Sequence, residues 1–322
     1  MRIGNVYNLE SIKALLDSAK AKGFQDSYTG VVLAHALTAI NPRIFEKKYP
    51  GLAFLTSGIE VDNTGGYARQ IESLRIREQG GFTTSGDESG NKGRISLAGE
   101  NNLLKVLERE GHTLWNDTDA RRAELQGVNL VSQFLSAHNK LYQREIDEAG
   151  YLGVPDIATS TGLLNTAAFT SVAATGAIGT LTAQQMYDDI AGLITAQHNA
   201  VNNTPEYMAV KVDMPNYVLN TLGVTILNTA AGSASVLSAL KANFPGVEFR
   251  GTHRADNAGG AGVSHTVAYS NNPEVMQMRI PVPLTISEIV KVSGFDYRVD
   301  SKYSIGGLDI LESTGGYILI GL

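Results

Sequence analysis

Residues 67–77 read YARQIESLRIR and residues 80–93 read GGFTTSGDESGNKG. Apolar and polar side chains alternate in the first segment, which is the period of a half-exposed β-strand. The second segment is rich in glycine and has almost nothing able to enter a core, and a short strand resumes at Arg94–Leu97. The stretch therefore predicts a long two-stranded arm with a flexible tip. Because a two-stranded ribbon is marginally stable alone in water, we expect a second copy of the chain to support it.

Charged side chains of both signs follow one another along this arm. Exposed charges often form no more than a solvated surface, but an arm with little core of its own favours pairing with a neighbouring copy. An exposed ion pair gives only about 0–1 kcal/mol, so such pairs would set register more than strength. The predicted intersubunit contacts are Arg69, Arg75, Arg77, Glu78, Asp87, Glu88, Lys92 and Arg94.

Downstream of the arm, helical periodicity predicts one long helix. Asn116 or Asp117 is a suitable N-cap, and Gly150 is a natural stop. A helix over 117–149 would be roughly 50 Å long at 1.5 Å per residue. Gly127 is the one position where we expect a break.

The remaining sequence predicts an α+β protein. Residues 9–22 and 31–40 have helical patterns, while 288–322 reads as short strands separated by Gly-Gly pairs. The region between alternates helices and strands. Helices are predicted at 183–197 (capped by Thr182), 215–222 and 235–243, and strands at 207–212, 247–250, 265–269 and 275–280.

Composition narrows the function classes. The chain has 322 residues, 43% hydrophobic and 18% charged, which excludes wholesale disorder and allows one large domain or two ordinary ones. Lys plus Arg is 26 and Asp plus Glu is 32, so the net charge of −6 argues against a protein whose main task is to bind nucleic-acid phosphates. The absence of cysteine excludes disulfides, thiolate zinc sites and cysteine nucleophiles. Without a secretory or membrane-spanning segment, the sequence predicts a soluble intracellular protein.

The search for catalytic motifs is negative. The sequence contains no P-loop, H-E-x-x-H or G-x-S-x-G motif, and no two histidines have the i,i+4 spacing of metal ligands. His253 and His265 flank a glycine-rich loop at 255–264, which fits a mobile loop better than a dinucleotide fingerprint. We therefore predict no catalytic residue, no cofactor and no metal.

The order of the predicted elements resembles that of tailed-phage major capsid proteins, which adopt the Hong Kong 97-type fold also found in encapsulin shells. Local sequence also supports the resemblance. Residues 39–52 resemble the entry from an N-terminal arm, and Gly162–Asn165 resembles the turn after the spine helix. The closing strands of the family are resembled by the segments around 295–308 and 317–318. The resemblance covers nearly the whole chain and rests on order and length, because no single motif is specific.

The resemblance implies a division of the chain. Residues 1–56 would be the N-terminal arm and 57–105 the extended β-hairpin loop. A peripheral domain with the long spine helix would comprise 106–158 and 284–322, and an α/β axial domain 159–283. The loop containing Asn257, Gly259 and Gly260 would lie near the capsomer axis.

The resemblance also implies a function. The chain would be a structural, non-enzymatic shell subunit that assembles as pentamers and hexamers into an icosahedral capsid. The capsid would be assembled in the host cytoplasm and would form part of the virion. Its partners would be neighbouring subunits, with scaffold, portal and decoration proteins possible, and it would enclose DNA without sequence-specific binding and without contact with a membrane. The Lys–Asn cross-link of some shells is not carried over, because Lys92 has no matching partner, and the N-terminal scaffolding segment has no counterpart here.

Three alternatives stay open at the level of sequence. An encapsulin-type compartment would have the same fold but enclose an enzyme. An enzyme could bind a small ligand in the α/β region at 183–283, near His253 and His265. A tail or baseplate component would form rings or tubes rather than closed shells.

Overall fold

The computed structural model describes residues 51–83, 94–125, 129–228, 234–260 and 262–322. The chain divides into two compact units, the larger comprising 49–120 and 130–322 and the smaller 1–48 and 121–129. The sheets and surfaces discussed below all belong to the larger unit. Most of the predicted N-terminal arm, with its helices at 9–22 and 31–40, lies outside the described residues.

A five-stranded mixed sheet forms the centre of the predicted axial region. Strand β10 is antiparallel to β16 and β6, while β5 and β9 add parallel strands at the two edges. Every residue of β10 is buried, as expected of a central strand covered on both faces. In spatial order the strands are β5 (Thr170–Ala173), β16 (Gly316–Ile320), β10 (His265–Tyr269), β6 (Lys211–Pro215) and β9 (Glu248–Thr252).

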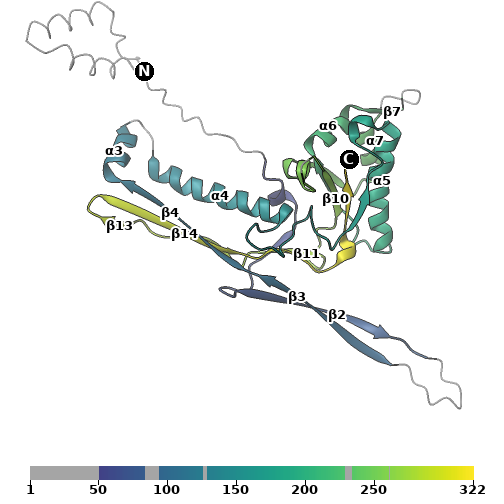
Figure 1. Ribbon diagram of the computed structural model, residues 1–322, viewed down its shortest axis with the longest axis horizontal. Helices are drawn as coiled ribbons and strands as arrows, with labels where there is room; N and C mark the ends of the chain where they lie inside the picture. Colours follow the sequence, from purple (N-terminus) through teal and green to yellow (C-terminus); the bar gives the residue numbers. More distant parts are fainter. Residues whose placement is uncertain (1–50, 84–93, 126–128, 229–233, 261) are drawn as a thin grey trace, which may run out of the picture. The chain divides into compact units, whose positions relative to one another are not determined.

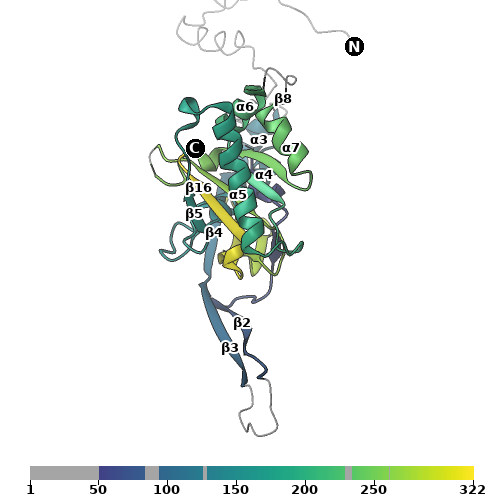
Figure 2. The ribbon, with the colours of Figure 1, turned by 90° about the vertical axis from the view of Figure 1, so that its right-hand side faces the viewer.

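Three helices cover one face of this sheet: α5 (Ala183–Ala200), α6 (Asn216–Val224) and α7 (Val236–Asn243). Figure 2 shows α5 in front of β16 and β5. Apolar side chains of the helices pack on Ala268 and Leu319 of the sheet. The predicted Thr182 cap is confirmed, because its hydroxyl accepts from Gln185 N–H at 3.3 Å while the Gln185 side chain accepts from Thr182 N–H at 2.9 Å.

The other face of the sheet shares a second core with a three-stranded sheet and helix α4 (Leu130–Leu152). The small sheet has the order β1 (Glu60–Asp62), β11 (Met276–Arg279) and β15 (Gly307–Ile310). Tyr151 at the end of α4 is fully buried there, in edge-to-face contact with Phe54 at a centroid distance of 5.5 Å. This core joins the helix to both sheets.

A buried carboxylate links the same parts. Asp213 on β6 has no exposed surface and accepts two bonds of 2.8 Å from Arg250 on β9. The Tyr151 hydroxyl donates to Asp213 at 2.7 Å, and Arg250 also donates to the Ala53 carbonyl at 3.1 Å. Burial, followed by the Asp213 charge, raises the Tyr151 pKa far above its usual value. The network therefore fixes the chain at residue 53 to the axial sheet and to α4.

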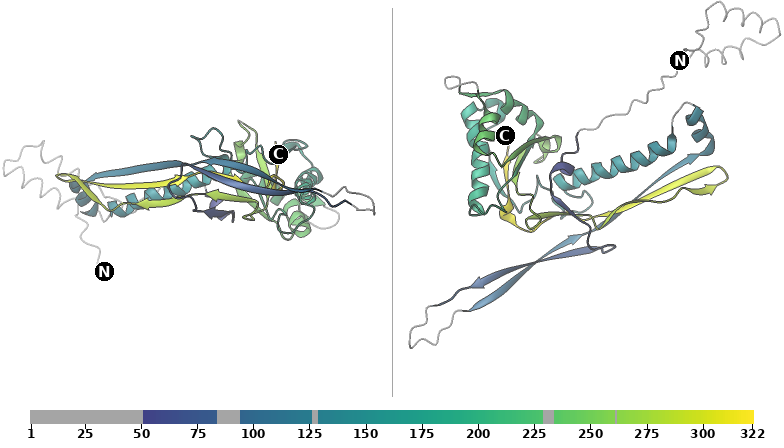
Figure 3. Two further views of the ribbon diagram at one scale, coloured as in Figure 1. Left: turned by 90° about the horizontal axis from the view of Figure 1, so that it is seen from below. Right: turned by 180° about the vertical axis from the view of Figure 1, so that it is seen from behind.

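A four-stranded sheet lies along α4 (Figure 3). Strand β14 (Asp296–Ile305) pairs with β4 (Leu107–Asn116) over its full length, and β12 (Val282–Ile286) and β13 (Val290–Ser293) pair with its two halves. Strand β4 was not predicted from the sequence. The ring of His138 on α4 lies between the hydroxyls of Thr113 and Ser301, 2.7 Å from each, and ties the helix to this sheet.

The helix predicted over 117–149 is two helices, and they separate around Gly127, the position where a break was expected and which lies outside the described residues. Helix α3 covers Asp117–Leu125, Asn129 is not helical, and α4 begins at Leu130. Gly150 does not end the helix: it lies inside α4, where a Cβ would come within 2.4 Å of the Phe54 ring. The stop is Gly153, whose φ of +87° and N–H bond to the Ala149 carbonyl terminate the helix. The spine helix is therefore the 23-residue α4, roughly 34 Å long.

Other boundaries differ less. The predicted strand 265–269 coincides with β10, whereas the strand predicted at 207–212 begins at Lys211. None of the helices in the described part of the chain has the length and apolar character needed to cross a membrane. The remaining short elements are β7 (Ile226–Asn228), β8 (Ala234–Ser235), and 3-10 turns at Phe54–Thr56, Ile178–Thr180, His253–Asn257 and Ser313–Gly315.

Candidate assembly surface

The predicted arm is present as an antiparallel ribbon of two 11-residue strands, β2 (Gln70–Gly80) and β3 (Ile95–Lys105) (Figure 1). Its strands pair in register from Gln70 with Lys105 to Gly80 with Ile95. Residues directly opposite each other share a face of the ribbon, and the faces alternate along each strand. The ribbon therefore has two chemically different faces.

One face carries large apolar side chains that are exposed to solvent. Leu74 and Ile76 of β2 are 64% and 59% exposed, and Leu97 and Leu103 of β3 are 69% and 59% exposed. The register places all four on one face, because Leu103 lies opposite Glu72 and Leu97 opposite Glu78. We call these four residues the apolar face. Contiguous exposed apolar side chains on a soluble chain are typical of an interaction site.

The opposite face is polar and is attached to the rest of the unit at its base. The carboxylate of Asp309 on β15 is fully buried and accepts from Ser73 Oγ at 2.6 Å and from Asn102 Nδ2 at 2.8 Å. Arg279 of β11 donates to the same carboxylate at 3.1 Å and also pairs with Asp62. Because Ser73 and Asn102 are opposite each other, one buried carboxylate is bonded to both strands of the ribbon.

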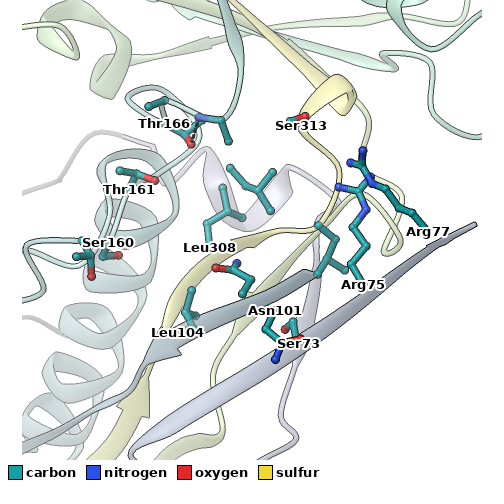
Figure 4. Close-up of a pocket in the computed structure, with 16 residues that line it drawn as sticks. Ser73, Arg75, Arg77, Asn101, Leu104, Ser160, Thr161, Thr166, Leu308 and Ser313 are labelled. Carbon is teal, nitrogen blue, oxygen red and sulfur yellow. Dashed lines mark hydrogen bonds between the residues drawn. The ribbon is translucent and has the colours of Figure 1, made fainter. Parts of the chain in front are cut away.

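A groove lies beside this base, between the polar face of the ribbon and the body of the unit (Figure 4). Its volume is about 400 Å³. The apolar part of its lining includes Leu104, Leu308, Ile310 and Leu311. Hydroxyl groups come from residues 159–161, Thr166 and Ser313, and Arg75 and Arg77 enter from β2. We call it the ribbon-base groove.

The structure brings part of the predicted contact set together. Arg75 and Arg77 lie on the polar face, where Arg75 pairs with Glu312, whereas Glu78 lies on the apolar face opposite Leu97. Arg69 and Arg94 precede the two strands. Asp87, Glu88 and Lys92 lie outside the described residues. That these side chains contact a second copy stays a prediction.

The predicted capsomer-axis loop follows the short turn His253–Asn257. Gly260 N–H donates to the Asn257 carbonyl at 3.1 Å, and Gly259 N–H to the Val263 carbonyl at 3.1 Å. Gly260 has a φ of +111°, which disfavours a residue with a side chain. The loop is a hydrogen-bonded turn, and its place at an axis stays a prediction.

Three titratable side chains, His253, Asp256 and His265, lie near this loop. His265 is buried, and its Nδ1 lies 2.5 Å from the Leu164 carbonyl oxygen, so its ring is held by the backbone. Burial, followed by the charge of Arg254, lowers the pKa of His253, while burial raises the pKa of Asp256. Within the ranges that the structure describes, no three His, Asp or Glu side chains are grouped so as to hold a metal ion.

The exposed apolar face and the ribbon base were not singled out from the sequence. Period-2 alternation of Leu74 and Ile76 with Arg75 and Arg77 was the available signal for a ribbon with two different faces. No comparable signal existed for Asp309, which bonds to Ser73 across 236 positions of sequence.

A long ribbon, a spine helix on a four-stranded sheet, and a helix-covered five-stranded sheet together define a shell-forming protein of the Hong Kong 97-type fold. The major capsid protein family model matches residues 93–315, and the chain belongs to that family.

Solved structures agree with this assignment. The capsid of Myoviridae phage XM1 has 41% sequence identity and a TM-score of 0.80, with 90% of this chain and 98% of that chain covered. The capsid of a native GTA particle has 12% identity and a TM-score of 0.65, covering 89% and 96% of the two chains. A structure from Mycobacterium phage Ogopogo has 10% identity and a TM-score of 0.60, covering 88% and 96%. The last two show the fold alone. Among curated protein sequences, none matches the chain.

The chain therefore has a structural role in a phage capsid shell and is a component of the virion capsid. The comparisons lend no support to an encapsulin-type compartment or to a small-ligand enzyme built on residues 183–283. In a capsid shell each subunit is surrounded by further copies of itself, so the surfaces of the ribbon have neighbouring copies near them.

Proposed function

We propose that copies of this chain assemble as pentamers and hexamers into a closed icosahedral shell that encloses phage DNA, and that the ribbon makes contacts between copies. The observation that carries the proposal is the apolar face, four large side chains each more than half exposed on a two-stranded ribbon. Burying apolar surface against a second copy contributes about 25 cal/mol per Å². The ion pairs expected between the ribbon and the neighbouring copy then determine the register in which the two copies align.

We also propose a division of the chain into domains. Residues 57–105 form the extended loop, 106–158 with 284–322 the peripheral domain, and 159–283 the axial domain, with Asn257, Gly259 and Gly260 near the capsomer axis. Strand β16 of the C-terminal segment hydrogen-bonds to β10, so the axial sheet includes a strand from outside 159–283. Shell subunits of obligate type bury roughly 2,000–5,000 Å² or more per interface, which requires several such surfaces.

Assembly takes place in the host cytoplasm, and scaffold, portal and decoration proteins are the further partners. The net charge of −6 supports a container that holds DNA without sequence-specific binding. The chain is expected to have no enzymatic activity and no cofactor.

The test is negative-stain imaging and native mass measurement of the purified full chain. Closed particles, or capsomers of five and six copies, are the expected result. Open tubes or single-size rings would instead indicate a tail or baseplate component. A chain that stays monomeric or dimeric, with and without its phage's scaffolding protein, would contradict the proposal.

A further inference from the structure

The ribbon-base groove has a lining suited to an extended polypeptide. Leu104, Leu308 and Ile310 provide an apolar surface. Around them, the hydroxyls of Thr161 and Ser313 can bond to the N–H and C=O groups of a main chain. Figure 4 shows that polar side chains come from both walls of the groove, Arg75 and Arg77 from the ribbon and Thr161 and Ser313 from the body.

The groove also holds an excess of positive charge. Arg75 and Arg77 alternate along β2 and both line the groove, at the end where Ser313 lies (Figure 4). Arg75 pairs with Glu312, whereas Arg77 has no ion-pair or hydrogen-bond partner within the described ranges. A carboxylate supplied from outside would be attracted to Arg77 and would reduce the repulsion between the two cations.

We propose that the ribbon-base groove receives an extended, carboxylate-bearing segment of a second copy of this chain, with one of its carboxylates paired to Arg77. The inference rests on the proposed function, because it names the partner of the ribbon in the shell. The occupant is a second copy because the chain is a capsid-shell subunit with a net charge of −6, so neighbouring copies present more carboxylates than cations.

The location strengthens the choice of occupant. One wall of the groove is the ribbon, whose opposite face carries the exposed leucines and Ile76. A second copy inserted between ribbon and body would contact both strands close to the carboxylate of Asp309 that anchors them. The groove would then fix the ribbon's position only after another subunit has arrived.

The absence of cysteine makes a direct test possible. Ser313→Cys places a single thiol in the groove, and Gln184→Cys places one on the exposed surface of α5 as a control. Maleimide labelling is measured for free subunits and for assembled particles of each variant. We expect assembly to slow labelling at position 313 at least tenfold more than at position 184. Equal labelling of the groove thiol in particles and in free subunits would overturn the proposal.

A cross-linking arm identifies the occupant. A benzophenone maleimide attached to Ser313→Cys is activated by light in particles assembled from mixed isotope-labelled and unlabelled subunits. We expect cross-linked peptides that join the two isotopes and contain Asp or Glu. Cross-links confined to one copy, or to packaged nucleic acid, would contradict the assignment. Protection of the thiol in free subunits by millimolar inorganic phosphate would likewise overturn it, since the groove would then be a phosphate site.

The charge of Arg77 is tested separately. Arg77→Gln is expected to raise the subunit concentration needed for assembly about tenfold, and Arg77→Lys to restore most of the assembly, because the attraction between two unit charges needs only a cation at this position. Assembly of Arg77→Gln at the wild-type concentration would contradict the proposed pair. Failure of the wild-type chain to form any shell is a different outcome, which rejects the proposed function and with it a second copy in the groove.

Discussion

The axial sheet and the ribbon are both built from β-strands, but the two differ in burial. In β10, all five residues are buried between two hydrophobic cores. In β2, an 11-residue strand, Ser73 is the one buried residue. Strand formation alone therefore does not decide where stability comes from. The axial sheet carries its own core, whereas the ribbon has a base attached to the body and a face that lacks a covering layer within the described chain.

The difference assigns different tasks to the two regions. Loss of a buried group in the axial sheet changes the folding free energy of the subunit, because its cores are complete within one chain. Changes on the exposed ribbon leave the free subunit almost unchanged and act on association. Three variants, each with a control, test this comparison in decreasing order of their effect on unfolding.

The largest effect is expected for Asp213→Ala. This substitution leaves the Arg250 guanidinium buried without its carboxylate and removes the acceptor of the Tyr151 hydroxyl. Breaking a buried ion pair from one side costs about 3–5 kcal/mol. Urea unfolding followed by circular dichroism measures the loss. Asp300→Ala is the control, because its pair with Arg298 is about half exposed and worth about 0–1 kcal/mol. Similar losses for both variants would contradict the assignment of Asp213 as a structural centre.

The sequence predicts this region well where the signals are local. The Thr182 cap and strand 265–269 follow from capping chemistry and from a short apolar run between turn residues. The interruption between α3 and α4 lies around Gly127, where a break was expected, whereas the end of α4 was predicted wrongly. Gly150 is required by its contact with Phe54, a residue far away in sequence, rather than by helix termination. Periodicity cannot distinguish a glycine needed for close packing from one needed for a turn.

A smaller effect is expected for Asp309→Asn at the junction of the two regions. The amide keeps the shape of the carboxylate, but its NH₂ group faces donors from Ser73, Asn102 or Arg279. Unsatisfied buried donors cost about 1–3 kcal/mol. Hydrogen exchange should increase at the base of the ribbon and not in β10. Asp188→Asn on the exposed surface of α5 should leave both regions unchanged. Equal exchange increases in β10 and the ribbon would show that Asp309 stabilises the whole unit.

Of the assembly surface, the ribbon could be predicted from the sequence and the ribbon-base groove could not. The ribbon follows from alternation and a glycine-rich tip, and the charges of Arg75 and Arg77 can be read directly. The residues that surround Arg75 and Arg77 in space cannot be predicted from the sequence, because the ribbon-base groove joins β2 and β3 to residues 159–168 and to β15. Such long-range contacts leave no periodic trace in one sequence. For the same reason, the partner of Arg75, Glu312, could not be inferred.

The smallest effect on unfolding is expected when threonine replaces Leu74 and Ile76 together. Threonine retains strand preference, and both positions are mostly exposed, so the unfolding free energy should stay within about 0.5 kcal/mol of the wild type. Assembly, followed by light scattering, should nevertheless require a higher subunit concentration.

Val267→Thr makes a matched change in the opposite region, because it places a hydroxyl in the fully buried strand β10. That change should cost about 1–3 kcal/mol, since a buried polar group loses its water without gaining a partner. Comparing the ribbon variant with Val267→Thr separates effects on the folding of the subunit from effects on its association. If the ribbon variant unfolded as early as Val267→Thr, the ribbon would contribute to the subunit's own core. If it instead assembled like the wild type, the apolar face would not be an intersubunit surface.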